Sequence, residues 1–163
     1  MKRIALTLVA LGLAGSALAQ DATFQTKSLT PESALTAARA ALESCRKQGY
    51  QVAVAVVDRS GLLQVLLRDR YAGAHTIDIA TNKAWTAASF RQSTLEFGKE
   101  TQPGKPMSGI RHHPQVIAAG GGLTIEGGGS VLGGIGISGA PGGEADESCA
   151  RAGLKAIAES LEF

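Results

Sequence analysis

Residues 119–146 read AGGGLTIEGGGSVLGGIGISGAPGGEAD, and this stretch decides how the rest of the chain can fold. Glycine makes up twelve of the twenty-four residues at 120–143, yet short runs of Leu, Ile, Val and Thr separate the glycines. Glycine in a strand loses backbone entropy on folding and offers no side chain to pack. So many glycines therefore indicate tight turns or close approach to another surface. The pattern predicts a hairpin, with strands 122–126 and 130–138 joined by a turn at 127–129.

Within this segment, residues 134–139 match G-x-G-x-x-G, the pattern of dinucleotide-binding loops. That motif works where a strand turns into a helix inside a βαβ unit, with an acidic residue at the end of the next strand. Here the pattern lies in a predicted strand, and the sequence up to Phe163 predicts one helix and no further strand. No G-K-[ST] follows to form a phosphate loop. We therefore interpret the glycines as parts of a structural hairpin.

Residues 1–19 have the features of a secretory signal peptide. Lys2 and Arg3 form the positive end, a short apolar run covers 4–13, and Ala-Leu-Ala at 17–19 is a small-x-small cleavage site. The apolar run is too short to span a bilayer. We expect cleavage near Ala19 and a periplasmic or secreted mature chain.

Removal of the signal peptide changes the charge of the protein. Lys+Arg falls from 16 to 14 while Asp+Glu stays at 14, so the formal net charge falls from +2 to 0. A neutral chain lacks the basic surface that nucleic acid binding requires, so we expect no nucleic acid partner. Residues 20–28 are polar and predicted to be disordered. Residues 29–163 are predicted to form a single domain.

Helical and strand patterns alternate through this domain. Thr30 and Pro31 are typical of a helix start, and Gly49 is typical of a left-handed helix end. In chain order we expect a helix from 31 to 48, strands 51–58 and 62–67, helices 74–90 and 93–99, an irregular segment 102–114, the hairpin, and a helix 144–161. Strands joined by tight hairpins form an antiparallel sheet, which the helices would cover. The predicted class is α/β (α+β).

Cys45 and Cys149 are the two cysteines of the chain and lie in the first and last predicted helices. Export would place them in an oxidising compartment, where an even cysteine count favours a disulfide. Such a bond requires the two helices to lie side by side on one face of the sheet. The alternative is a pair of buried free thiols.

Four motifs occur together and in order: VAVVDRSG at 54–61, ATNKAWTA at 80–87, GGGLTI at 120–125 and GGIGISGAPGGEAD at 133–146. Their combination resembles the GlcG/HbpS-like family of haem-binding proteins, which is similar to the C-terminal domain of PduO-type cobalamin adenosyltransferases. The resemblance covers about residues 29–161. It implies profilin-like α-β-α layers, with the N- and C-terminal helices packed on a central antiparallel sheet. It also implies a homo-oligomer and reversible binding of haem or a related tetrapyrrole.

Haem requires an apolar slot and an axial donor, most often histidine. Three histidines are candidates, and adjacent histidines on an extended segment would point to opposite sides, so at most one of the pair should face a given pocket. The candidates are His112, His113 and His75, with Met107, Tyr50 and Tyr71 as weaker donors. The alternative is that these histidines are solvated loop side chains. The backbone at Gly120, Gly121 and Gly122 would allow a flat ligand to approach closely.

Three basic residues could hold the carboxylates of haem or of a small acid, or could be solvated: Lys83, Arg91 and Arg111. No Ser-His-Asp arrangement and no metal-ligand spacing is present in the sequence, so we expect no catalytic residue, no metal site and no turnover. One alternative function is a binding accessory or enzyme for a small organic acid, because the family name comes from a glycolate-use setting. Another is a purely structural oligomer.

Overall fold

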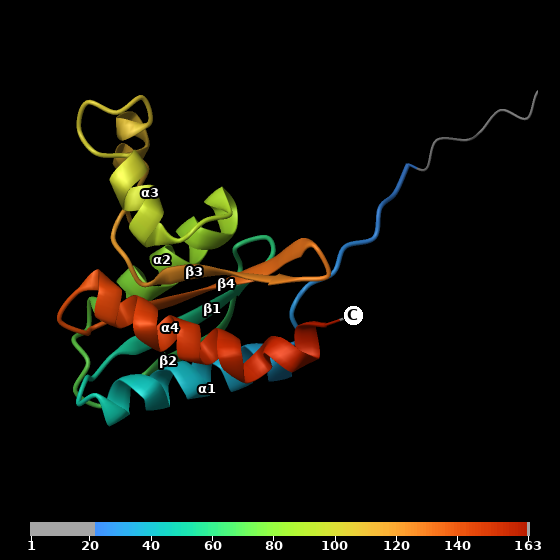
Figure 1. The fold of residues 1–163 in the computed structure, drawn as a ribbon, viewed down its shortest axis with the longest axis horizontal. Helices are drawn as coiled ribbons and strands as arrows, with labels where there is room; N and C mark the ends of the chain where they lie inside the picture. The colour runs from blue at the N-terminus through green and yellow to red at the C-terminus, as the bar shows by residue number, and fades with distance from the viewer. Residues whose placement is uncertain (1–21, 163) are drawn as a thin grey trace, which may run out of the picture.

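The structure is a computed structural model that describes residues 22–162 (Figure 1). The predicted signal peptide lies outside the described residues. In chain order the elements are α1 (Pro31–Lys47), β1 (Ala53–Asp58), β2 (Leu63–Arg68), α2 (Thr76–Phe90), α3 (Thr94–Glu100), the 3-10 helix η1 (Ser108–His112), β3 (Gly122–Gly127), β4 (Ser130–Ser138), α4 (Gly143–Ile157) and the 3-10 helix η2 (Ala158–Leu161). Between residues 22 and 162, no helix is long and apolar enough to cross a membrane.

The four strands form one antiparallel sheet in the order β2-β1-β4-β3. Two local hairpins supply the outer pairs, and the pairing of β1 with β4 joins them, with Val56 opposite Ile135. The β3–β4 hairpin turns through Gly128 and Gly129, both with positive φ, as a two-residue hairpin turn requires. The predicted antiparallel sheet and the predicted hairpin are both confirmed.

Helices cover both faces of the sheet, with α1 and α4 on one face and α2 on the other (Figure 1). Successive side chains along β1 and β4 point to opposite faces of the sheet, so one face can carry large side chains and the other small ones. Val54, Val56, Ile135 and Ile137 belong to the core under α1 and α4. The residues of β1 and α2 that face each other on the opposite side are small: Ala53, Ala55, Val57, Ala80, Ala84 and Ala88.

The glycines of β4 allow α2 to lie close to the sheet. A Cβ at Gly136 would lie 2.1 Å from the carbonyl oxygen of Ala80, and a Cβ at Gly134 would lie 2.4 Å from that of Ala84. No real Cβ fits at such distances, so the helix backbone packs against the strand backbone. The alternating G-I-G-I sequence of β4 thus places isoleucine in one core and bare backbone under α2.

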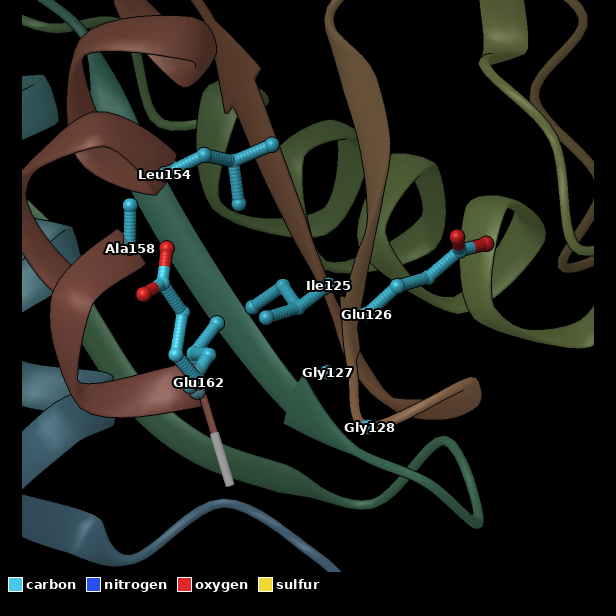
Figure 2. A pocket seen from close by; sticks show the side chains of 8 residues that line it. Ile125, Glu126, Gly127, Gly128, Leu154, Ala158 and Glu162 are labelled. Atoms are coloured by element: carbon cyan, nitrogen blue, oxygen red, sulfur yellow. The ribbon is translucent and has the colours of Figure 1, made fainter.

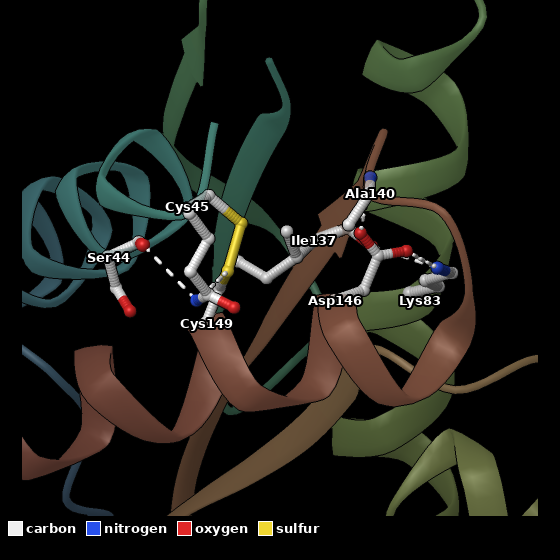
Figure 3. Close-up of a disulfide and its surroundings, with 8 residues drawn as sticks. Ser44, Cys45, Lys83, Ile137, Ala140, Asp146 and Cys149 are labelled. Carbon is white, nitrogen blue, oxygen red and sulfur yellow. Dashed lines mark hydrogen bonds and ion pairs between the residues drawn. A yellow bond between two sulfur atoms is a disulfide. The ribbon is translucent and has the colours of Figure 1, made fainter. Parts of the chain in front are cut away.

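A disulfide joins Cys45 of α1 to Cys149 of α4, across a sequence separation of 104 residues (Figure 3). Both cysteines are fully buried, and the two helices lie side by side on one face, as the predicted bond requires. The loop-entropy model gives about 4.7 kcal/mol for closing a loop of about 100 residues. The covalent link therefore stabilises the α1/α4 layer.

The predicted start of the first helix at Thr30 and Pro31 is confirmed, and the other helices begin within two residues of the predicted positions. The segment 102–114, predicted to be irregular, contains a short 3-10 helix. The side chains of Thr30 and Ser93 accept hydrogen bonds from the backbone N–H groups three residues ahead, capping α1 and α3. Within the segment, η1 forms a 3-10 turn that ends at His112. Together, α3 and this segment project away from the sheet beyond α2 (Figure 1).

Candidate functional site

Arg111 fixes the histidine-bearing segment to the end of α3. Its Nε donates to the carbonyl oxygen of Thr101 at 2.6 Å, and its Nη2 donates to the carbonyl oxygen of Gly98 at 2.7 Å. These carbonyls lie in the last turn of α3, where backbone acceptors are unpaired and the helix dipole favours a cation. The guanidinium of Arg111 is therefore engaged in holding the loop.

His112 lies on a small cavity of about 360 Å³ formed by this segment. The cavity wall is largely apolar and is formed by Pro103, Gly104, Ser108, Gly109, Arg111 and His112. A Cβ at Gly104 or Gly109 would meet nothing within 4 Å, so the space above both glycines is open. Among the described residues, the His112 ring has no hydrogen-bond partner, and the side chain is exposed. It is an unengaged imidazole beside an apolar surface.

His113, the next residue, points elsewhere and stacks on Trp85 of α2. The ring centroids are 5.3 Å apart and the planes are within 5° of parallel. Its Nδ1 accepts a hydrogen bond from the backbone N–H of Gln115 at 3.3 Å, so the neutral ring carries its proton on Nε2. Ligation of a metal through Nε2 would require that proton on Nδ1 instead. The two histidines thus face different surroundings, and His112 is the better placed donor.

Trp85 was not singled out from the sequence, yet it connects the histidine segment to the β1–β2 turn. Its indole covers Gly61, where a Cβ would lie 2.7 Å from the indole Cδ1. The stack on His113 therefore ties α2, the turn and the segment after η1 together. A lone Trp on a helix beside a small-residue face is the one sequence signal that could have indicated this role.

His75, the third candidate, lies at the N-terminal end of α2 and is exposed. Ten residues of helix separate it from Trp85, a rise of about 15 Å. The structure therefore does not bring His75 together with the other two histidines.

Lys83 is buried in α2 and pairs with Asp146 of α4 past the edge of the sheet (Figure 3). Its Nζ lies 2.7 Å from Oδ2 of Asp146 and 2.9 Å from the carbonyl oxygen of Ile137, and each side chain is 5% exposed. The backbone N–H of Ala140 donates to Oδ1 of Asp146 at 3.0 Å. Burial raises the pKa of Asp146 above its usual range, although Lys83 opposes this shift. A ligand carboxylate at Lys83 would have to displace Asp146.

The triple glycine at 120–122 packs against elements of this same chain. A Cβ at Gly120 would lie 2.9 Å from the carbonyl group of Gly143, and a Cβ at Gly121 would lie 2.6 Å from the Cβ of Asp146. Gly121 also has a φ of +112°, a backbone conformation that residues with a side chain rarely adopt. The close approach that these glycines permit is an internal contact around the Lys83–Asp146 pair.

Arg91 is the predicted carboxylate candidate that remains exposed and lines a cavity. It forms the C-cap of α2 with a left-handed backbone (φ 56°, ψ 41°). The same cavity contains Arg59 from the β1–β2 turn, a residue that no sequence pattern indicated as a ligand-binding candidate. Lys83 and Arg111 are both engaged inside the protein, so the three predicted cations do not form one site.

A separate apolar groove of about 620 Å³ lies between the edge strand β3 and the C-terminal end of α4 (Figure 2). Ile125 and Leu154 point into it, whereas Glu126 points away (Figure 2). None of the described residues that line this groove is His, Met, Cys or Tyr, so they offer no axial donor to haem. Across residues 22–162, no group of three or more His, Cys, Asp or Glu side chains could hold a metal ion.

Comparison with known proteins identifies the family to which this fold belongs. Residues 29–155 match the family model described as "Haem degrading protein HbpS-like". The chain belongs to the HbpS-like family. This agrees with the resemblance seen in the four sequence motifs, and the match covers both layers of helices and the whole sheet.

Three solved structures share the fold over 80% to 95% of the chain. A double mutant of HbpS from Streptomyces reticuli superposes with a TM-score of 0.80 at 36% identity, covering 95% of this chain and 99% of that one. Protein ORFY of Klebsiella pneumoniae gives a TM-score of 0.82 at 30% identity, covering 85% and 97%. A structure of a PduOC:Heme Complex gives 0.75 at 31% identity, covering 80% and 95%.

Among curated proteins, the corrinoid adenosyltransferase PduO of Salmonella typhimurium is 36% identical over 103 residues, which is 62% of this chain. The match covers 31% of PduO, so the chain spans about a third of the length of the first curated relatives it matches.

Proposed function

We propose that this chain is an exported protein that binds haem reversibly and does not itself turn haem over. Family membership and the haem complex of a relative support the ligand class. The observation that carries the proposal is local. His112 presents an imidazole without a hydrogen-bond partner, among the described residues, on a largely apolar cavity.

The residues around His112 fit one edge of a tetrapyrrole. A cavity of about 360 Å³ lies near the lower end of the roughly 300–1,000 Å³ range of ligand pockets, so a large flat ring would lie partly outside it. His112 would supply the axial nitrogen, while Pro103 and the open backbone at Gly104 and Gly109 would face the ring. Bound haem would supply a redox-active iron. The chain contains no C-x-x-C-H attachment sequence, so binding is expected to be reversible.

A hemin titration of the purified mature protein, followed by the Soret band, tests this function. We expect saturable binding by the wild type. The affinity of His112→Ala for hemin should be at least about tenfold weaker, because loss of the axial bond should cost more than the roughly 1.4 kcal/mol that corresponds to a tenfold change. His113→Ala and His75→Ala are the matched variants. Absence of saturable binding in the wild type would overturn the function. Loss of hemin affinity only in His113→Ala or in His75→Ala would overturn only the choice of His112 as the axial residue.

The family description names haem degradation, whereas we propose binding without turnover. Among the described residues that line the cavity, His112 is the one available acid–base side chain, because Arg111 is engaged in holding the loop. Hemin-loaded protein is incubated in air with ascorbate and catalase, beside free hemin. A Soret band that persists supports binding alone. Decay faster than that of free hemin, and lost in His112→Ala, would show turnover and contradict the proposal.

Export and assembly need their own measurements. Periplasmic fractionation of cells that express residues 1–163, with N-terminal sequencing of the product, should give a chain that starts at Gln20. Its cysteines should resist alkylation until reduced, because Cys45 and Cys149 are paired. Light scattering after size exclusion tests the predicted homo-oligomer, and a monomer at all concentrations would contradict it.

A further inference from the structure

The cavity that Arg91 lines has a volume of about 310 Å³ and lies where three segments far apart in sequence meet at one end of the sheet. Arg59 comes from the β1–β2 turn, and Ala88, Ser89 and Arg91 come from the end of α2. Gly129 comes from the β3–β4 turn, and Ser130 and Val131 from the start of β4. Its wall is mainly polar. The described residues of the wall supply two guanidinium groups and two hydroxyl groups, and no carboxylate.

The two arginines are available to a ligand. None of the ion pairs among the described residues involves Arg91 or Arg59. One Nη of Arg59 donates to the hydroxyl of Thr26 at 2.6 Å, which leaves the rest of its donor fork free. Two like charges on one small cavity repel each other unless an anion lies between them.

The backbone of Arg91 supports the same conclusion. Among residues 22–162 it is the one non-glycine residue with positive φ. This conformation is costly for an L-residue and favours glycine at a helix C-terminus. A strained residue at a cavity with an unpaired charge points to a functional constraint on its side chain.

We propose that Arg59 and Arg91 form a binding site for a small carboxylate. Arginine binds carboxylates through paired N–H donors, and Ser89 and Ser130 add hydroxyl groups at the same wall. The C-terminal end of α2 contributes partial negative charge, which disfavours a doubly charged phosphate more than a singly charged carboxylate. Ala88 and Val131 leave room for a short apolar chain. Among the described residues, the cavity wall contains no axial donor to haem, so the site does not depend on haem binding.

Thermal shift and calorimetry with sodium acetate and sodium lactate test the site at constant ionic strength, with sodium chloride as the reference salt. Saturable stabilisation by either carboxylate is expected, since a ligand of the native state raises its melting temperature. Arg91→Gly removes the guanidinium but keeps a residue suited to the left-handed backbone. Arg59→Ala changes an exposed turn side chain. Each variant should bind carboxylate at least about tenfold more weakly, the loss of roughly one charge-assisted hydrogen bond.

Arg39→Ala, on the exposed face of α1, is the matched control for loss of one positive charge. Equal weakening in this control, or no saturable effect in the wild type, would overturn the proposal. Tighter binding of inorganic phosphate than of acetate or lactate would overturn the carboxylate class. Hemin titration of the same variants separates this site from the haem proposal. Unaltered hemin affinity supports an independent site, whereas parallel loss of hemin and carboxylate would assign the arginines to haem and overturn it.

Discussion

The two faces of the sheet are packed by different means. Under α1 and α4, large aliphatic side chains fill the space and a disulfide links the two helices. Under α2, alanines and glycines bring helix and strand backbones into contact, with hardly any side chain between them. Packing on the first face depends on large buried side chains. Packing on the second depends on residues with little or no side chain.

This difference bears on function, because α2 carries Trp85 and ends at Arg91. A helix that packs by backbone contact has little freedom to shift, since interiors packed at this density do not deform gradually. The small-residue face therefore sets where both candidate sites lie relative to the sheet. The α1/α4 face supplies stability at a distance from them.

Gly136→Ala should break the α2 face and give the largest effect. The added Cβ would lie 2.1 Å from the carbonyl oxygen of Ala80, and backbone cannot move aside as a flexible side chain can. We expect a loss of at least about 3 kcal/mol in the free energy of unfolding, at the upper end of overpacking. Urea denaturation measures it.

The neighbouring residue supplies the comparison. Ile135→Val removes one methyl group from the α1/α4 core and should cost only about 0.5–1.5 kcal/mol. Gly129→Ala has open space around it, so its cost should be limited to its positive φ, about 1 kcal/mol. If Gly136→Ala were as mild as either control, close backbone packing would not be what fixes α2.

Features of the fold that depend on local sequence patterns could be predicted, whereas features that depend on distant contacts could not. The hairpin at 122–138 was predicted closely because its turn and its alternation are local patterns. The disulfide was predicted because export and cysteine count constrain it. The pairing of β1 with β4, and the choice of face for each helix, depend on contacts distant in sequence. No local pattern specifies them.

The sites were harder to predict than the fold for the same reason. His112 and Arg91 were identified by residue type, but their surroundings come from other segments. The stack of Trp85 on His113, the position of Arg59 beside Arg91 and the capture of Lys83 by Asp146 each join residues 28 or more positions apart. The residue type indicates which side chains could bind a ligand, and tertiary contacts determine which of them are available to bind it.

Removal of the disulfide should weaken the other face. Replacement of Cys45 and Cys149 together by alanine keeps both Cβ atoms and is expected to cost about 2–5 kcal/mol, chiefly through the entropy of the unfolded chain. Hydrogen exchange should then show faster opening of α1 and α4 than of α2. Equal acceleration in all three helices would mean that the two helix layers unfold as one unit, and the disulfide would not stabilise the α1/α4 layer separately.

At the end of α2, Arg91→Gly should raise stability. Glycine adopts the left-handed conformation without a Cβ penalty, and the gain should be about 0.5–1 kcal/mol after its greater freedom in the unfolded chain is counted. Thermal unfolding in chloride buffer measures it. Combined with weaker carboxylate binding, this gain would show that the side chain serves binding at the expense of stability. A loss of stability would instead indicate that the guanidinium supports the fold.

The smallest expected effect is a difference in pH dependence between two buried carboxylates. Hydrogen bonding to Arg46 lowers the pKa of Asp69 below 3.8, so its contribution to stability is present above that pH and is lost as the pH falls. Burial raises the pKa of Asp146 above 3.8, so its contribution is present at acid pH and is lost as the pH rises through the raised value.

Asp69→Asn and Asp146→Asn separate these contributions, since every other carboxylate is common to the variants. Stability measured by urea unfolding from about pH 3 to pH 6 should fall less steeply on acidification in Asp69→Asn than in the wild type. In Asp146→Asn it should fall more steeply. The second variant also leaves Lys83 buried without its carboxylate partner, so its stability should be lower at every pH, and only the slope reports the titration. If both variants shifted the slope in the same direction, attraction by Lys83 would outweigh burial at Asp146, and the ion pair between α2 and α4 would be an ordinary stabilising salt bridge.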